Sequence, residues 1–178
     1  MTDLQVHDKQ FEPYIDAGSL ASRVAELASQ ITEDLSGKNP LFLSVLNGSF
    51  IFTADLLRAL HFPLDVSFVK LASYTGTGSS GTVRRLIGLD ESIRDREVVI
   101  VEDIVDTGLT MKQLLKDLSA MQPSGVSIVT LLFKKEAFRC DFDIDYCGFV
   151  VPDRFLVGYG LDYDGLGRNY SDIYTLKT

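Results

Sequence analysis

The chain has 178 residues, of which 46% are hydrophobic and 24% charged, and its formal net charge at pH 7 is −8. This length fits one domain with a sizeable buried core, and the acidic surplus argues against a nonspecific nucleic-acid surface. No stretch approaches the roughly 20 apolar residues that a membrane helix needs, and the first residues lack the apolar core of a signal peptide. We therefore expect a cytoplasmic protein without nucleic-acid or membrane partners.

The first part of the chain predicts an arm followed by alternating helices and strands. Residues 1–13 predict an extended or loosely packed arm. Apolar residues recur at helical spacing over 19–35, which predicts an amphipathic helix. The next expected elements in chain order are a buried strand, a second helix and a second strand, at 41–46, 50–60 and 64–71.

A polar segment and then a series of apolar strands follow. Residues 73–82 are rich in glycine and serine and poor in apolar side chains, which predicts a mobile loop. A helix is expected from Leu109 to Met121, and strands are expected at 84–89, 97–101, 126–133, 146–151 and 155–158. Because strands alternate with helices, we predict the α/β class, with one domain whose parallel, twisted, doubly wound sheet is flanked by helices.

The cysteines and histidines form no recognisable metal or catalytic pattern. Cys140 and Cys147 lack metal-ligand spacing, so we expect reduced structural thiols. His7 lies in the predicted arm and His61 at the end of a predicted helix, which supports neither a zinc cluster nor a His-based triad. Surface or helix-cap roles are expected for both histidines.

The most informative segment of the chain is 98–110. An apolar run that predicts a buried strand leads into Glu102 and Asp103, and then into Asp106 within a Thr/Gly turn that precedes a helix. Ligands of open α/β sheets bind at the carboxyl ends of strands, and the free N–H groups of a helix N-terminus suit a phosphate. Carboxylates beside a phosphate need a hard cation between them. The segment therefore predicts a phosphorylated sugar or nucleotide together with Mg²⁺.

This segment resembles the phosphoribosyl diphosphate (PRPP) motif of the type I phosphoribosyltransferases. Four further segments resemble the hypoxanthine-guanine branch of that family in the expected order, at 46–50, 70–74, 132–135 and 151–168. The resemblance implies the type I phosphoribosyltransferase fold over residues 1–178, with a small hood formed by about 1–15 and 145–170. It also implies a purine salvage enzyme that exchanges the pyrophosphate of PRPP for hypoxanthine or guanine and yields the nucleoside 5′-monophosphate.

The resemblance assigns most of the acidic motif to PRPP. Glu102 and Asp103 would bind the ribose hydroxyls and help to hold Mg²⁺, while a turn of backbone amides and hydroxyls would wrap the 5′-phosphate. The loop at Asn47 often carries a non-proline cis peptide in this family, many relatives have Lys in place of Asn47, and some have Arg in place of Lys70. The remaining expected PRPP residues are Thr107, Gly108, Leu109, Thr110, Asn47, Gly48, Lys70, Ser73, Tyr74 and Arg168.

The purine would meet a separate set of residues. Asp106 would be the general base that accepts the N7 proton, although an N-cap of the following helix is an alternative role for this aspartate. Lys134 would donate to O6, which favours 6-oxopurines over 6-aminopurines. The resemblance places four further residues at the base, namely Phe155 by stacking, Arg154, Leu156 through its backbone, and Asp162, which would also bind a second Mg²⁺.

Three other interpretations stay open at the level of sequence. PRPP-sensing regulators share the phosphoribosyltransferase fold, but they need a basic surface that the net charge of −8 does not favour. Phosphoacceptor receiver domains also have an acidic pair at a strand end, but after the first strand rather than after about 100 residues. A xanthine-preferring enzyme is the nearest alternative within the family. The family also suggests a homodimer or homotetramer.

Overall fold

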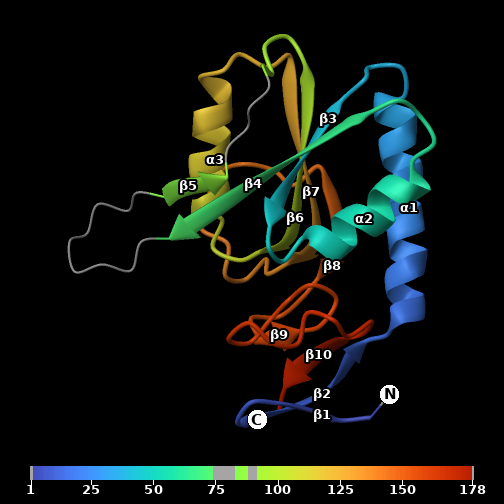
Figure 1. Cartoon of the computed structure of the whole chain (residues 1–178), viewed down its shortest axis with the longest axis vertical. Coiled ribbons are helices and arrows are strands. Elements are labelled where there is room, and N and C mark those ends of the chain that lie inside the picture. The colour runs from blue at the N-terminus through green and yellow to red at the C-terminus, as the bar shows by residue number, and fades with distance from the viewer. Residues whose placement is uncertain (1, 74–82, 88–91, 178) are drawn as a thin grey trace.

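The computed structural model describes residues 2–73, 83–87 and 92–177, and within them the chain forms two sheets and three helices (Figure 1). The larger sheet has the strand order β5-β4-β3-β6-β7-β8. Its strands are β3 (Leu41–Leu46), β4 (Asp65–Ser73), β5 (Val83–Ile87), β6 (Glu97–Val105), β7 (Gly125–Phe133) and β8 (Tyr146–Val150). The helices are α1 (Ala17–Leu35), α2 (Phe50–Ala59) and α3 (Leu109–Ser119). In the described residues, no helix is long and apolar enough to cross a membrane.

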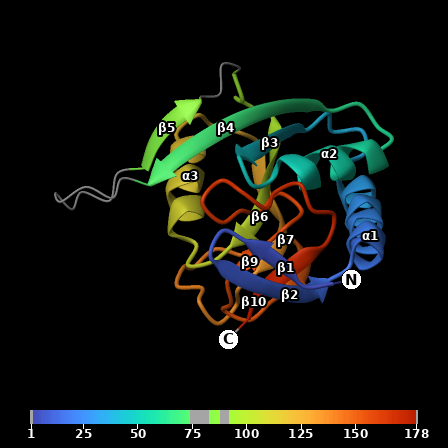
Figure 2. The same ribbon diagram turned by 60° about the horizontal axis from the view of Figure 1, so that its bottom comes forward.

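The parallel doubly wound sheet that the sequence predicts is confirmed. Strands β4, β3, β6, β7 and β8 pair in parallel, and only β5 runs antiparallel, at the edge beside β4. Helices α1 and α2 cover one face of the sheet and α3 covers the other (Figure 2). The expected helices and strands up to residue 133 are present with shifts of a few residues at their ends.

Both faces of the central strands are apolar because each face has a helical layer. In β6, Val99 and Val101 pack in the α1–α2 cluster, whereas Val98 and Ile100 pack in the α3 cluster. Strand side chains alternate between faces, so a strand that is buried on both sides reads as a continuous apolar run. That continuous run is the signal that identifies β6 in the sequence.

Strand β6 continues further than the sequence predicts. The expected strand ends at residue 101, but β6 includes Glu102 and Asp103 and ends at Val105. Glu102 pairs with Thr130 of β7, and Val105 pairs with Phe133. The acidic pair is therefore held by a sheet ladder on a rigid element, rather than by the loop that follows it.

The second sheet is a small antiparallel hood below the carboxyl ends of the core strands (Figure 1). Its order is β1-β2-β10-β9, formed by β1 (Leu4–Val6), β2 (Lys9–Ile15), β10 (Ile173–Leu176) and β9 (Leu156–Val157). The arm is extended, which is one of the two predicted alternatives, but it is not loosely packed, because β1 and β2 form a hairpin and Phe11 is fully buried. The sequence does not predict β10. Residues of β8, which the resemblance places in the hood, belong to the core sheet.

Candidate active site

The carboxyl ends of three adjacent parallel strands bring together residues that are far apart in sequence. Val105 of β6 pairs with Phe133 of β7, which pairs with Val150 of β8. Asp106 and Lys134 directly follow two of these ends, and the backbone N–H of Lys134 donates to the Val105 carbonyl at 2.9 Å. The site is thus built at the sheet edge where α/β proteins bind ligands.

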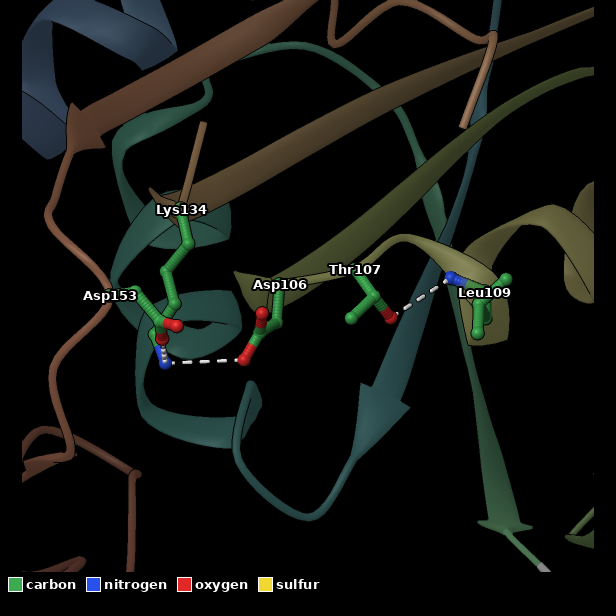
Figure 3. A network of polar contacts seen from close by, with 5 residues as sticks. All are labelled: Asp106, Thr107, Leu109, Lys134 and Asp153. Carbon is green, nitrogen blue, oxygen red and sulfur yellow. Dashed lines mark hydrogen bonds and ion pairs between the residues drawn. The ribbon is translucent and has the colours of Figure 1, made fainter. Parts of the chain in front are cut away.

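Lys134 lies between two carboxylates at this edge (Figure 3). Its Nζ donates to Asp106 Oδ2 at 3.1 Å and to Asp153 Oδ1 at 2.9 Å, and the residue is only 9% exposed. Burial opposes the charged ammonium, but hydrogen bonds and charges from Asp153 and Asp106 outweigh it and raise the pKa of Lys134. Lys134 is therefore a protonated hydrogen-bond donor.

A small pocket of about 110 Å³ surrounds the turn that opens α3. Gly108 is the N-cap of α3 in the left-handed conformation (φ +83°), and as a glycine it has no side chain that could cap the helix. Nearby, the N–H of Leu109 points to Thr107 Oγ1 at 3.5 Å (Figure 3). Amides of a first turn left without a side-chain cap can bind an anion. The lining residues are Glu102, Ile104, Val105, Asp106, Thr107, Gly108, Leu109, Thr110 and Met111.

The structure excludes one of the two roles considered for Asp106. The helix begins at Leu109 with Gly108 as its N-cap, so Asp106 lies outside the capping position. The Asp106 carboxylate instead accepts the hydrogen bond from Lys134. The N-cap alternative is wrong, and Asp106 remains a carboxylate at the rim of the pocket.

Glu102 and Asp103 are crowded together on β6. Burial raises the pKa of Glu102 well above its ordinary value, and the adjacent Asp103 charge adds to the increase. Burial also raises the pKa of Asp103, although hydrogen bonds from Glu102 and from the N–H of Ile104 oppose this. Two crowded carboxylates are stabilised by a nearby cation or by hydroxyl donors, and hard oxygen donors of this kind suit Mg²⁺. The pair therefore fits both a ribose diol and Mg²⁺.

The loop after β3 contacts the acidic pair through a glycine. The Leu46–Asn47 peptide bond is cis, and a Cβ at Gly48 would overlap the Asp103 carboxylate, with Oδ1 only 3.1 Å away. The Gly48 carbonyl lies close to Gly160 of the hood, so a Cβ at Gly160 would overlap the Gly48 carbonyl oxygen. Lys70 pairs with Leu46 in the sheet and so lies beside this loop.

Arg168 connects the hood to the acidic pair. Its guanidinium donates to the Gly160 carbonyl at 2.6 Å and pairs with Asp162 Oδ1 at 2.7 Å. The positive charge of Arg168 opposes the burial that raises the pKa of Asp103. Asp162 accepts a second hydrogen bond from the N–H of Gly165. Within the described part of the chain, no three acidic, His or Cys residues form one metal cluster, so Asp162 is not grouped with Glu102 and Asp103.

A family model for the phosphoribosyl transferase domain matches residues 14–164. The chain belongs to the phosphoribosyltransferase family. The hypoxanthine-guanine-xanthine phosphoribosyltransferase of Tritrichomonas foetus is 39% identical over 99% of this chain and 97% of its own length. The hypoxanthine-guanine phosphoribosyltransferase of Aquifex aeolicus is 39% identical over 97% of this chain and 98% of its own.

Structural similarity leads to the same family. A crystal structure of a hypoxanthine phosphoribosyltransferase from Staphylococcus aureus matches with a TM-score of 0.89 and 37% identity, over 93% of this chain and 91% of that one. The α/β fold with its parallel sheet is therefore the fold of these phosphoribosyltransferases, and the four-stranded antiparallel sheet is the hood. Membership of this family rules out the receiver-domain alternative.

The residues that the sequence resemblance predicts at the purine lie in β9 of the hood and just before it. Phe155 is 44% exposed, and its ring packs against Phe11 at 6.3 Å and Tyr163 at 5.6 Å between ring centroids. Arg154 is exposed beside it, whereas Leu156 is buried in β9. The exposed Phe155 ring offers a flat apolar surface for stacking. Its contacts with the two other aromatic rings hold it in place.

Two features of the site fall outside what the sequence predicts. The sequence indicates only a turn at Asp153, and the contact of this residue with Lys134 depends on the register between β7 and β8. Phe11 supports the Phe155 ring from the segment that the sequence predicts as an arm.

The predicted mobile loop is described only at its start. Ser73 is the last residue of β4, whereas Tyr74 and the rest of 74–82 lie outside the described residues.

Proposed function

We propose that this phosphoribosyltransferase transfers the 5-phosphoribosyl group of PRPP to hypoxanthine and guanine. Purine N9 forms a bond to C1 of the ribose, the C1–O bond to pyrophosphate breaks, and the N7 proton leaves to a base. The products are the nucleoside 5′-monophosphate and pyrophosphate. The single observation that carries this proposal is the Asp106–Lys134 pair beside the pocket at the start of α3, because the pair offers a carboxylate that can accept a proton and an ammonium that can donate to O6, next to the proposed phosphate site.

PRPP is proposed to occupy the α3 pocket and the acidic pair. The 5′-phosphate accepts hydrogen bonds from the first-turn amides of α3 and from the Thr107 and Thr110 hydroxyls. Glu102 and Asp103 accept from the ribose hydroxyls, and the same carboxylates stabilise the positive charge that develops on the ribose as pyrophosphate departs. The proposed pyrophosphate contacts are the backbone of Asn47 and Gly48, the side chains of Lys70 and Arg168, and the Ser73–Tyr74 pair.

Mg²⁺ is the proposed cofactor. When bound, it neutralises the pyrophosphate and supports its departure. Glu102 and Asp103 are proposed ligands, because their burial raises the pKa of each carboxyl and a cation relieves this. Asp162 is the proposed ligand of a second ion, and in this structure its carboxylate is held by Arg168.

The purine is proposed to stack on Phe155 with its 6-oxo group toward Lys134. A protonated lysine donates to an oxo acceptor, whereas a 6-amino group offers the ammonium no acceptor at that position of the base. Leu156 contributes its backbone and Arg154 its side chain at the base edge. Asp106 accepts the N7 proton, as a carboxylate within hydrogen-bond reach of the purine can.

We further propose that the enzyme is a cytoplasmic homodimer or homotetramer. Val66 and Phe68 of β4 are 41% and 40% exposed, and Phe50 at the start of α2 is 44% exposed. Val66 and Phe68 are two residues apart on one strand and so lie on the same face of it, and neighbouring exposed apolar side chains are typical of subunit contacts. Light scattering on the eluting protein over a range of concentrations would test this, and a monomer at micromolar concentration would contradict it.

The activity is tested by incubating the purified protein with PRPP, Mg²⁺ and hypoxanthine, guanine or xanthine, and by identifying the nucleotide product. We expect inosine and guanosine monophosphate, no product after chelation of the metal, and a loss of about 100-fold in kcat for Asp106→Asn, because that change removes the base but keeps the shape. A higher kcat/KM for xanthine would favour the xanthine-preferring alternative. Binding of PRPP without turnover of any 6-oxopurine would overturn the enzyme proposal and favour a PRPP-binding regulator.

A further inference from the structure

The Lys134 ammonium has two carboxylate partners, but the reaction needs it to keep only one. Asp106 follows β6 and Asp153 follows β8, so the two carboxylates come from different loops on either side of β7 (Figure 3). Both hydrogen bonds are made at once, at 3.1 Å and 2.9 Å. Together the two carboxylates raise the pKa of Lys134 against the effect of its burial.

The ion pair between Lys134 and Asp106 conflicts with the roles of both residues. The Asp106 oxygen that accepts the hydrogen bond from the ammonium is already occupied, yet Asp106 must take a proton from the purine. Lys134 must also direct a hydrogen bond to O6. Both requirements are met when the ammonium moves from Asp106 to the purine. A 9%-exposed ammonium that gave up every carboxylate would be costly.

We propose that Asp153 is a positioning residue that holds the Lys134 ammonium toward O6 while Asp106 is released to act as the base. This inference rests on the proposed function. Asp153 acts through Lys134 rather than by contact with the purine. Its place is fixed by the sheet, because the N–H of Val151 donates to the Phe133 carbonyl at 2.9 Å and aligns the loop after β8 with the end of β7.

The expected size of the effect follows from the exposure of the two partners. The Lys134 side chain is 11% exposed, but that of Asp153 is 62% exposed, so solvent screens part of the interaction. Loss of a hydrogen bond to a charged group of this exposure should reduce kcat/KM for hypoxanthine by about tenfold. Because the PRPP contacts lie elsewhere, KM for PRPP should stay within about twofold of the wild-type value.

The experiment compares Asp153→Asn with Asp153→Glu and with Asp143→Asn, an exposed aspartate in the β7–β8 connection. We expect Asp153→Asn to lower kcat/KM for hypoxanthine, Asp153→Glu to restore most of it, and Asp143→Asn to behave as the wild type. Equal kinetics for Asp153→Asn and Asp143→Asn would overturn the proposal. So would equal losses toward hypoxanthine and PRPP, because they would indicate a general structural role.

A second measurement does not depend on turnover. The ¹³Cε resonance of Lys134, assigned by its absence in Lys134→Arg, reports the pKa of the ammonium in the enzyme alone. We expect this pKa to fall in Asp153→Asn and to recover in Asp153→Glu, and an unchanged value would refute the proposed hold on Lys134. If the wild type turned over no purine, the proposed function would fail, and the titration would still decide whether Asp153 holds the ammonium.

Discussion

A single methyl group at Gly48 should disable PRPP binding without unfolding the protein. The Cβ of Gly48→Ala would overlap the Asp103 carboxylate, and even the far oxygen Oδ1 would be 3.1 Å away. Non-bonded carbon atoms normally approach to about 3.5 Å, so the carboxylate must move by about 1 Å or more. A displacement of about 1 Å in a positioned group costs about 100-fold in rate. We therefore expect kcat/KM for PRPP to fall about 100-fold.

The assay is initial-rate kinetics with PRPP as the varied substrate, combined with thermal unfolding of the same preparations. Gly37→Ala is the control, because Gly37 has a positive φ (+86°) but open space where the methyl group would lie, and it belongs to the turn after α1. That variant should lose some stability through backbone strain and keep wild-type kinetics. If Gly48→Ala kept kcat/KM for PRPP within threefold of the wild-type value, this would refute the argument that the close approach of Gly48 positions Asp103 for PRPP.

Two further predictions concern stability. Glu102→Gln should raise Tm at neutral pH while it lowers activity. The folded protein binds more protons than the unfolded chain at pH values between the ordinary and the raised pKa of Glu102, so wild-type stability falls as pH rises through that interval. Thermal unfolding at a series of pH values should show a flatter dependence of Tm on pH for the variant. An unchanged slope would contradict the raised pKa of Glu102. Tyr159→Phe removes a 2.6 Å hydrogen bond from the buried tyrosine to Asp55 Oδ2 on α2 and should lower the free energy of unfolding by about 1 kcal/mol. Urea unfolding measures this change, and an unshifted midpoint would show that this contact between hood and core contributes nothing to stability.

The parts of the fold that the sequence predicts well are those with a local signal. Strand β6 has a continuous apolar run because helices cover both faces of the sheet, and α1 has apolar residues at helical spacing because one face is buried. The hairpin of β1 and β2 has no such signal. Phe11 becomes fully buried only because β10 and Phe155 reach it from the other end of the chain.

The site is predictable where one segment carries it and not where the sheet assembles it. Residues 102–111 line the α3 pocket almost continuously, so a short motif can identify them. The extension of β6 through Glu102 depends on pairing with Thr130 of β7, which no local pattern shows. Asp153 lies 19 residues from Lys134, and only the parallel register of β7 and β8 brings the two together.

In the proposed function, the substrates change both groups of charges in the site. Glu102 and Asp103 crowd two carboxylates on one strand, and ribose hydroxyls that donate to them relieve that repulsion. The ammonium of Lys134 is shared between Asp106 and Asp153, and a purine oxo group that accepts from it frees Asp106 as a base. An interaction contributes to catalysis rather than to binding alone only if it is stronger in the transition state than with the bound substrate. The crowded charges of Glu102 and Asp103 meet this condition in the proposed function, because the positive charge that stabilises them develops on the ribose as pyrophosphate departs.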